Sequence, residues 1–303
     1  MKSLLSALFG ILPVMCFCQT KEPQMMRIVM QPEVEINKQT DLKIYFNRLP
    51  DKGAVQIDST DDWEIIRENG AMGQNIDTEK YEYLFYTYAT PVKLGKIEIP
   101  PVSVKIKKVE YKSKPFSVDV VDSIMVDSNS VRTILVADKN TYQLQDTIQL
   151  SLYEYSKFSK ENKHIVKDTP DINNISISGK GNAINVSGEF TLEDIYGIQN
   201  IEKYLDEYFT VADLEWNPFY ENQTMEKLDG ENYIKTKLFT IYLLANKKGE
   251  YEFQPSIFDY SVYRSNDDYW RKFVPNDEGA YTVTNNGAVK LKVISNSVKI
   301  EVQ

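Results

Sequence analysis

One histidine and no recognisable nucleophile motif limit the chemistry open to this 303-residue chain. A zinc site or a Ser-His-Asp triad normally needs histidine, and His164 stands alone in a charged segment. That setting favours a solvated loop residue over a general base. The sequence also has no Gly-x-Ser-x-Gly motif, no phosphate-binding loop and no glycine-rich dinucleotide turn. We therefore expect no enzyme, with no catalytic residue, no metal ligand set of its own and no cofactor.

The densest group of carboxylates lies in the segment IDSTDDWE, which contains Asp58, Asp61, Asp62 and Glu64. A dedicated calcium loop places its ligands at alternating positions around a central glycine. This segment has no such glycine. A solvated loop is the simpler interpretation of the group.

The elements that would carry functional residues are strands, and they form a repeated unit. The segment LGKIEIPP at Leu94–Pro101 returns as KGEYEFQP at Lys248–Pro255. Each reads as a glycine turn and an alternating strand, ended by a proline that cannot donate to the ladder. The closing strands correspond too, so that Phe116, Val118 and Val120 align with Val298, Ile300 and Val302.

The opening strands of the two units can be aligned in the same way. Ile28 and Met30 fall on Ile134 and Val136, and the next strand gives the pairs Leu42 with Ile148, Ile44 with Leu150, and Phe46 with Leu152. The second unit is longer because it contains two insertions. In the first insertion Ile198, Ile201, Leu205 and Tyr208 recur at helical spacing, with Asn200 as a possible cap. A short helix and a loop with helical turns are both compatible with this spacing.

Short alternating strands separated by frequent turns predict an all-β fold. We expect two tandem immunoglobulin-like β-sandwich domains, of which the second is larger and carries the insertions. The first covers residues 19–124, a short polar linker covers 125–130, and the second covers 131–303. No cysteine and tryptophan signature of antibody domains is present, so the expectation depends on strand number and alternation.

Aromatic residues are the strongest candidates for a binding surface. The two insertions contain EWNPFYENQ and DDYWRKF, which bring the candidates Trp216, Phe219, Tyr220, Tyr269, Trp270 and Arg271. Trp, Tyr and Arg are the residue types that anchor interfaces. The alternative is that both insertions fold back and cover the protein's own surface. In the strand around Tyr83 and Phe85 one face must be core, and the opposite face with Leu84, Tyr86 and Tyr88 is either a second buried face or a contact patch.

The N-terminal segment MKSLLSALFGILPVMCFC has the layout of a signal peptide, residues 1–18. Lys2 precedes an apolar run from Leu4 to Phe17, and Cys16 and Cys18 stand three and one residues before a cut at Gln19. A lipoprotein signal fits these cysteines poorly. Export would leave a mature chain without cysteine, hence without disulfides.

Composition narrows the class of partner. The chain is 42% hydrophobic and carries a formal charge of −9 with both signs mixed along it. No basic patch with interleaved aromatics is present, which argues against nucleic acid. After the signal peptide no run reaches the ~18 apolar residues that a membrane span needs. We expect an exported, periplasmic protein without a membrane span in the mature chain, associated with the membrane only through partners.

The segment YTYATPVKLGKIEIPPVSVKIKKVEYKSKPFSVDVV, from Tyr86 to Val121, resembles the BatD, or oxygen-tolerance, family of exported bacterial proteins. The resemblance consists of an aromatic strand, the turn at Gly95, Ile99–Pro101, Tyr111–Pro115 and the closing strand to Val120. The second unit matches more loosely through Asp229–Pro255. The family often ends in a membrane helix, whereas this sequence stops at KIEVQ.

The resemblance implies a non-enzymatic periplasmic protein with tandem immunoglobulin-like domains, which works beside von Willebrand A-domain membrane proteins in oxygen or stress tolerance. Such domains can hold Mg²⁺ and complete its shell with a partner's carboxylate, a role that Asp61 or Asp62 could fill. The leading expectation is therefore a protein-protein interaction scaffold. The alternatives are a carbohydrate-binding or adhesive surface module, since exposed aromatics suit sugar stacking, and a hydrolase, which would need a constellation the sequence lacks.

Overall fold

The computed structural model describes residues 25–66, 71–76, 81–165, 176–180, 183–187, 197–217, 220, 222–277 and 279–303. These residues form strands and turns with two short helical segments, so the predicted all-β class is confirmed. The predicted signal peptide, residues 1–18, lies outside the described residues. Two large hydrophobic clusters divide the strands into an N-terminal half, residues 25–121, and a C-terminal half, residues 131–303.

The N-terminal half contains three small sheets. Its strands are β1 (Met26–Met30), β2 (Glu33–Glu35), β3 (Thr40–Phe46), β4 (Gln56–Ile57), β5 (Trp63–Ile65), β6 (Ala71–Ile76), β7 (Tyr81–Pro91), β8 (Gly95–Glu98), β9 (Val102–Ile106), β10 (Val109–Lys112) and β11 (Ser117–Val121). The sheet orders are β1-β3-β7-β5 with β6 also on β7, β10-β9-β4, and β2-β11-β8. Alternate residues of all three sheets, such as Ile44, Val104 and Val118, meet in one buried cluster.

The C-terminal half repeats this arrangement with longer strands. They are β12 (Val131–Ala137), β13 (Thr141–Tyr142), β14 (Thr147–Ser156), β15 (Glu161–Ile165), β16 (Ser176–Lys180), β17 (Ala183–Ser187), β18 (Phe209–Trp216), β19 (Thr224–Leu228), β20 (Glu231–Ala245), β21 (Gly249–Phe253), β22 (Ile257–Val262), β23 (Phe273–Pro275), β24 (Tyr281–Val283), β25 (Val289–Ile294) and β26 (Val298–Val302). The main orders are β12-β14-β20-β18 with β19 on β20, β15-β22-β25, and β13-β26-β21. Strand for strand, these match the three sheets of the N-terminal half.

The register of the repeated hairpin agrees with the alignment made from the sequence. In the first copy Gly95 pairs with Val120 and Ile97 with Val118. In the second copy Gly249 pairs with Val302 and Tyr251 with Ile300. Both glycines adopt positive φ, of 100° and 153°, a conformation that other residues rarely take. The turn chemistry and the alternation therefore fix the same closing hairpin in both halves.

The alignment of the first opening strand is wrong, whereas the pairs of the next strand, Leu42 with Ile148, Ile44 with Leu150 and Phe46 with Leu152, are buried in the cores of their halves. Met30 pairs with Leu42 in the first copy, but Val136 pairs with Ser151 and Ile134 with Tyr153 in the second. The buried residues of β12 are Val131, Thr133 and Leu135, whereas Val136 is exposed. Because side chains alternate along a strand, an odd shift moves the whole set to the other face. The polar Thr133 is one of the buried residues, so the alternation of apolar side chains did not show which face of β12 is buried.

The insertions of the second copy carry the helical elements. In the first, the 3-10 helix η1 (Ile201–Tyr204) follows Asn200, which has φ 57° and no side-chain cap bond. Ile198 and Ile201 are buried, so the apolar spacing was read correctly, but it yields one 3-10 turn. The second insertion forms the short helix α2 (Asn266–Trp270), which Ser265 caps by accepting from the Asp268 N–H, and the hairpin β23–β24.

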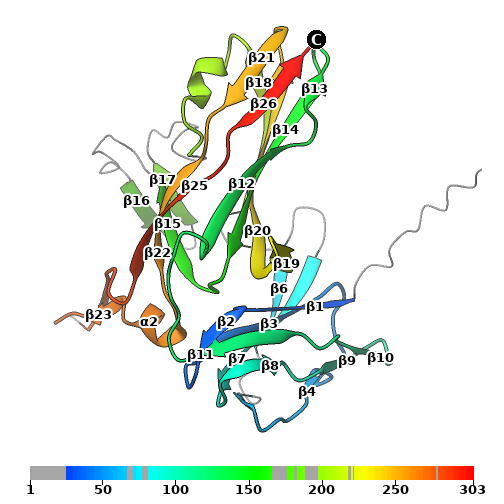
Figure 1. Ribbon diagram of the computed structural model, residues 1–303, viewed down its shortest axis with the longest axis vertical. Coiled ribbons are helices and arrows are strands. Elements are labelled where there is room, and N and C mark those ends of the chain that lie inside the picture. The colour runs from blue at the N-terminus through cyan, green and yellow to red at the C-terminus, as the bar shows by residue number, and fades with distance from the viewer. Residues whose placement is uncertain are drawn as a thin grey trace, which may run out of the picture.

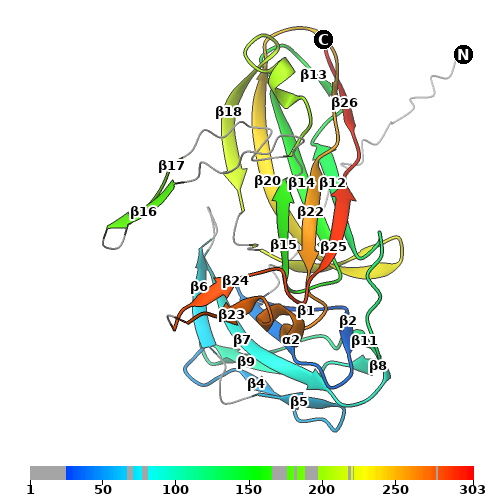
Figure 2. The ribbon, with the colours of Figure 1, turned by 90° about the vertical axis from the view of Figure 1, so that its left-hand side faces the viewer.

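The two halves form a bent molecule. In Figure 1 the strands of the C-terminal half run upward, while those of the N-terminal half run across the lower part of the picture. Figure 2 shows α2 and the β23–β24 hairpin between the two halves, above β7. The second insertion thus lies where the halves meet.

Candidate functional site

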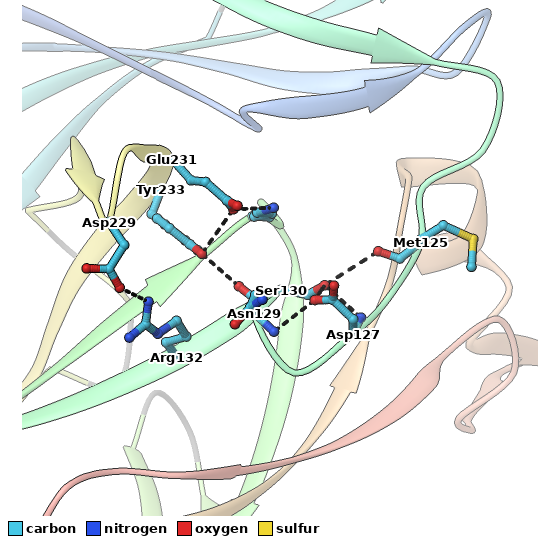
Figure 3. A network of polar contacts seen from close by, with 9 residues as sticks. Met125, Asp127, Asn129, Ser130, Arg132, Asp229, Glu231 and Tyr233 are labelled. Atoms are coloured by element: carbon cyan, nitrogen blue, oxygen red, sulfur yellow. Dashed lines mark hydrogen bonds and ion pairs between the residues drawn. The ribbon is translucent and has the colours of Figure 1, made fainter.

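The linker between the halves is folded into a turn that several hydrogen bonds hold in place (Figure 3). Asp127 Oδ1 accepts from the Asn129 N–H at 2.8 Å, and the Ser130 hydroxyl accepts from the Asp127 N–H at 2.9 Å. The buried hydroxyl of Tyr233, on β20, donates to the Asn129 carbonyl at 3.0 Å. The Ile124 side chain, just before the turn, is part of the C-terminal core. The linker therefore restricts the angle between the halves.

Ion pairs flank this turn on the side of β19 and β20. Arg132 Nη1 lies 2.6 Å from Asp229 Oδ2, and Lys157 Nζ lies 2.7 Å from Glu231 Oε2. Asp229 and Glu231 are about half exposed or more, so each pair contributes only ~0–1 kcal/mol. The ion pairs hold the β19–β20 turn in position beside the linker.

A buried glutamine joins the halves directly. Gln31 Nε2 donates to the carbonyls of Glu33 at 2.8 Å and of Arg264, in the other half, at 2.9 Å. Its Oε1 accepts from the N–H of Ser159 at 3.1 Å and from the Ser159 hydroxyl at 3.3 Å. Every hydrogen-bonding position of the amide is filled, and three of its four bonds cross the boundary. Such a satisfied buried amide favours one relative placement of the halves.

A buried aspartate forms a second connection. Asp41 Oδ1 accepts from Asn266 Nδ2 of α2 at 3.0 Å and from the Tyr86 hydroxyl at 2.6 Å. Lys160 Nζ lies 3.5 Å from Asp41 Oδ2. Burial, with the negative charge of Asp41 beside the phenol, raises the pKa of Tyr86 well above its ordinary value. Helix α2 is therefore bonded to the sheet of the N-terminal half.

An apolar cluster completes this boundary. Val29, Tyr45 and Ile234 are buried together, with Leu84 and Met225 packed against them. The guanidinium of Arg27 lies 4.3 Å from the centre of the Tyr45 ring, and its Nε donates to the Gln223 carbonyl at 2.6 Å. The face of β7 that carries Leu84 and Tyr86 is thus covered by the C-terminal half. The sequence left this face open between core and contact patch, and the structure assigns it to a boundary within the chain.

Three of the predicted binding residues lie together at α2. The Tyr269 ring lies between two lysines, 4.7 Å from Lys160 Nζ and 4.0 Å from Lys272 Nζ. Arg271 pairs with the buried Asp268 at 3.1 Å. The Trp270 ring contacts Tyr269 but remains 55% exposed. The insertion folds back on the protein through Tyr269, as the alternative interpretation held, while Trp270 faces outward.

The β23–β24 hairpin extends this exposed region. The rings of Trp270 and Phe273 are 5.5 Å apart, and Phe273 is paired with Val283. Val283 is 63% exposed and Tyr281 is 66% exposed. We call Trp270, Phe273, Tyr281 and Val283 the aromatic surface. Sequence reasoning missed the last three, although the alternating segments FVP and YTV in one insertion indicated a small hairpin with outward side chains.

The other predicted aromatics lie elsewhere. Trp216 ends the edge strand β18, paired with Phe239, and is 57% exposed. Tyr220 is half-buried against the C-terminal core, where Lys163 Nζ lies 5.6 Å from its ring centre. Burial raises the pKa of Tyr220. Phe219 lies outside the described residues.

The two predicted carboxylates lie in the turn before β5. Asp61 is exposed, and Asp62 Oδ1 lies 3.5 Å from Lys93 Nζ. The adjacent Trp63 is buried and donates from its indole nitrogen to the Glu98 carbonyl at 3.0 Å. Within the described residues no group of three or more His, Cys, Asp or Glu could hold a metal ion. A role for Asp61 or Asp62 at a partner's metal stays a prediction.

A buried pair of carboxyl groups is a further feature that the sequence did not reveal. Glu154 Oε2 accepts from the Tyr260 hydroxyl at 2.5 Å, while its Oε1 is buried and lacks a hydrogen-bond donor among the described residues. Glu161 Oε2 accepts from Ser156 at 2.6 Å. Burial, and then the neighbouring Glu154, raise the pKa of Glu161 well above its ordinary value. A protonated Glu161 can donate to the otherwise unpartnered Glu154 Oε1.

His164 lies on β15 opposite Asp259, not in a loop. Strands β16 and β17 pair with each other. Across the described part of the chain no helix is long and apolar enough to cross a membrane. We call the contact between the two halves, formed around Gln31, Asp41 and Asn266, the junction. The aromatic surface lies beside it.

Fold and geometry define an all-β protein whose two halves repeat one strand order. No family model and no curated protein matches this sequence. Among solved structures, the adhesin InvE of Yersinia pseudotuberculosis aligns at TM-score 0.19 and 10% identity, over 89% of this chain and 58% of that one. The D00-D0 domain of intimin aligns at TM-score 0.17 and 8% identity, over 91% and 98%. Invasin, described as a bacterial integrin-binding protein, aligns at TM-score 0.19 and 10% identity, over 92% and 59%.

Proposed function

We propose that this chain is an exported, non-enzymatic scaffold of the BatD type that holds other proteins through its surface. In this proposal the two halves are tandem immunoglobulin-like β-sandwich domains joined at residues 125–130. The matching strand orders and the separate hydrophobic clusters support that division. The segment that resembles BatD proteins, from Tyr86 to Val121, supplies most of β7 and all of β8–β11, the framework of the first half.

The observation that carries the proposal is the aromatic surface. Two of its side chains, Tyr281 and Val283, are each more than 60% exposed, and Trp270 is more than half exposed. Contiguous exposed aromatic and apolar side chains are typical of protein contact sites. Helix α2 is bonded to Asp41 of the other half, so the surface is presented in a fixed position. A rigid surface loses little conformational entropy on binding.

The resemblance names the partner class as von Willebrand A-domain membrane proteins of the periplasm. Asp61 and Asp62 are the carboxylates that this proposal offers to a metal held by such a partner. Asp61 is exposed and Asp62 pairs with Lys93 at 3.5 Å, a long surface pair that a metal ion can replace. Replacing both aspartates by alanine would leave partner affinity unchanged if this role is wrong.

The test is a crosslinking pull-down from the native envelope with tagged protein from Gln19 onward, first with Mg²⁺ and then with EDTA. We expect a von Willebrand A-domain protein to be recovered, and to be lost with Trp270→Ala plus Tyr281→Ser. Trp216→Ala is the matched control, because Trp216 is equally exposed but lies outside the aromatic surface. Recovery that is the same for all variants would contradict the assignment of the surface.

A carbohydrate-binding or adhesive module is the second candidate. The exposed Trp216 on the edge strand β18 favours it, since an exposed indole can stack on a sugar ring. A glycan array separates the two functions. Hits that disappear with Trp216→Ala would favour the sugar-binding module, and an array without hits together with a captured protein would favour the scaffold.

A further inference from the structure

One end of the first half is strongly basic, although the chain as a whole is acidic. Residues 48–52 and 105–112 hold six cationic side chains and two carboxylates, a net charge of +4, against −9 for the whole chain. All six cations are exposed, and we call them the basic tip: Arg48, Lys52, Lys105, Lys107, Lys108 and Lys112. The ion pairs found in the part of the chain that the structure describes all involve other cations.

Asp51 brings the two segments together. Its N–H donates to the Lys105 carbonyl at 2.8 Å, and its carboxylate accepts from the N–H groups of Lys107 at 3.1 Å and of Lys108 at 2.9 Å. This carboxylate is therefore occupied by backbone donors of the turn between β9 and β10. Glu110, the other carboxylate, lies opposite Lys105 on the neighbouring strand. One acid thus holds the turn and the other faces Lys105, so positive charge remains in excess at the end of the hairpin.

The end of this hairpin is a turn that normally takes other residues. Lys107 and Lys108 have φ of 51° and 67°. A two-residue hairpin turn with positive φ at both positions prefers Asn-Gly, because asparagine and glycine enter the left-handed region easily. A lysine in that region costs about 1–2 kcal/mol, which the bonds to Asp51 offset. The turn geometry does not explain two lysines here, whereas a ligand for their ammonium groups would.

Exposed aliphatic side chains stand among these cations. Leu49 is 56% exposed beside Arg48, and Val109 is 53% exposed beside Lys108. The one aromatic side chain of the two segments, Tyr111, packs against the core of the first half. A single-stranded nucleic acid would stack its bases on exposed rings, which these segments do not offer. A membrane surface needs what they do offer, ammonium groups for lipid phosphates and aliphatic side chains for the headgroup boundary.

The basic tip and the aromatic surface lie on different sides of the molecule. In Figure 1 the β9–β10 hairpin is at the right-hand end of the lower half, whereas α2 and β23 are on the left-hand side. The two surfaces can therefore be occupied at the same time.

We propose that the basic tip binds the surface of an anionic phospholipid membrane. Its ammonium groups contact lipid phosphates, and Leu49 and Val109 enter the headgroup boundary. Each cation near such a surface strengthens binding several-fold, and salt screens the attraction. The site uses none of the residues of the aromatic surface, so each can fail without the other. In the proposed scaffold it would keep a partner bound at the aromatic surface close to the membrane.

The test is sedimentation of protein from Gln19 onward with large vesicles of phosphatidylcholine, alone or with about one-third phosphatidylglycerol. The decisive variant is Lys107→Asn plus Lys108→Gly, which removes two charges and introduces the residue pair that this turn prefers. It should unfold at a higher temperature than the wild type, yet bind the anionic vesicles about tenfold or more weakly. Lys139→Gln plus Lys248→Gln is the matched control, because both are exposed lysines of the other half. The control has the same net charge as the decisive variant and should bind like the wild type.

A second comparison separates a membrane from an acidic polymer. Leu49→Ser should weaken binding to the anionic vesicles, because the aliphatic side chain enters the headgroup boundary. The same variant should leave binding to soluble polyglutamate unchanged, since that polymer has no apolar boundary to enter. Added NaCl should weaken vesicle binding by the wild type, because salt screens the charges of the basic tip.

Four outcomes would overturn the proposal. The wild type would fail to bind anionic vesicles at low salt, or it would bind neutral vesicles equally well. The decisive variant would bind as tightly as its matched control. Finally, the wild type would bind polyglutamate more tightly than vesicles, which would assign the basic tip to an acidic segment of a partner protein.

Discussion

Replacing Glu161 by glutamine should stabilise this protein at neutral pH. The pKa of Glu161 is raised by burial and by the adjacent Glu154, so in the folded state it holds a proton to a higher pH than in the unfolded chain. Above its unfolded value near 4.5, the native state therefore binds the extra proton, and stability falls as pH rises. The fall ends when the pH passes the folded pKa, and above that point the full penalty persists.

The magnitude follows from the number of protons involved. One proton held only by the native state gives a slope of at most about 1.4 kcal/mol per pH unit between the unfolded and the folded pKa of Glu161. The glutamine introduced by Glu161→Gln would be neutral at every pH and could donate its amide to Glu154 Oε1, which now lacks a donor among the described residues. The variant should equal the wild type at pH 4 and exceed it increasingly toward neutrality.

The assay is urea unfolding followed by fluorescence from pH 4 to pH 7.5. Lys163, whose pKa burial lowers to about 8, changes charge mainly above that range. Glu231→Gln is the control with the opposite sign, because Lys157 lowers the pKa of Glu231 and stabilises the folded state only above its unfolded value. Parallel stability curves for Glu161→Gln and wild type would refute the raised pKa of Glu161.

Two further substitutions test the junction. Gly287→Ala should unfold α2 or weaken its packing, because a Cβ at this φ of 82° would lie 2.4 Å from the Asp268 carbonyl oxygen. Gly279→Ala is the control, since Gly279 has φ 76° and open space around it. That variant should lose only the ~1–2 kcal/mol of unfolding free energy that left-handed strain costs. Differential scanning calorimetry of both variants gives the comparison, and equal losses would contradict the steric argument. Asn266→Ala removes one donor from the buried Asp41 and should cost about 1–3 kcal/mol, while widening the range of angles between the halves in small-angle X-ray scattering. An unchanged scattering curve would show that Asn266 does not set the angle.

The repeated hairpin was predictable because local rules determine it. Glycine at positive φ, alternation over Ile97 and Ile99, and a terminating proline each act within a few residues, and the same signals recur around Gly249. The register of the opening strand β12 was not predictable from the sequence. Thr133 is polar but buried, so the alternation of apolar residues indicated the wrong face of the strand as buried. A single polar residue inside was enough to shift the alignment.

The junction was outside the reach of sequence reasoning for a different reason. Gln31, Asp41 and Asn266 are polar, and a polar residue is normally read as exposed. They are buried because each finds its partners in the other half of the chain, at separations that no local pattern encodes. The sequence named both Tyr269 and Trp270 as candidates, but only the structure shows that Tyr269 turns inward while Trp270 faces outward.

The bond between Asn266 and Asp41 joins residues that are 225 positions apart in the chain. Synthesis runs from the N-terminus, so the first half leaves the ribosome complete long before α2 exists. During that interval the sheet face with Tyr45, Leu84 and Asp41 has no cover. The nascent first half therefore exposes an apolar strip that contains the Asp41 carboxylate, and we expect a chaperone to bind that strip before the second half closes over it.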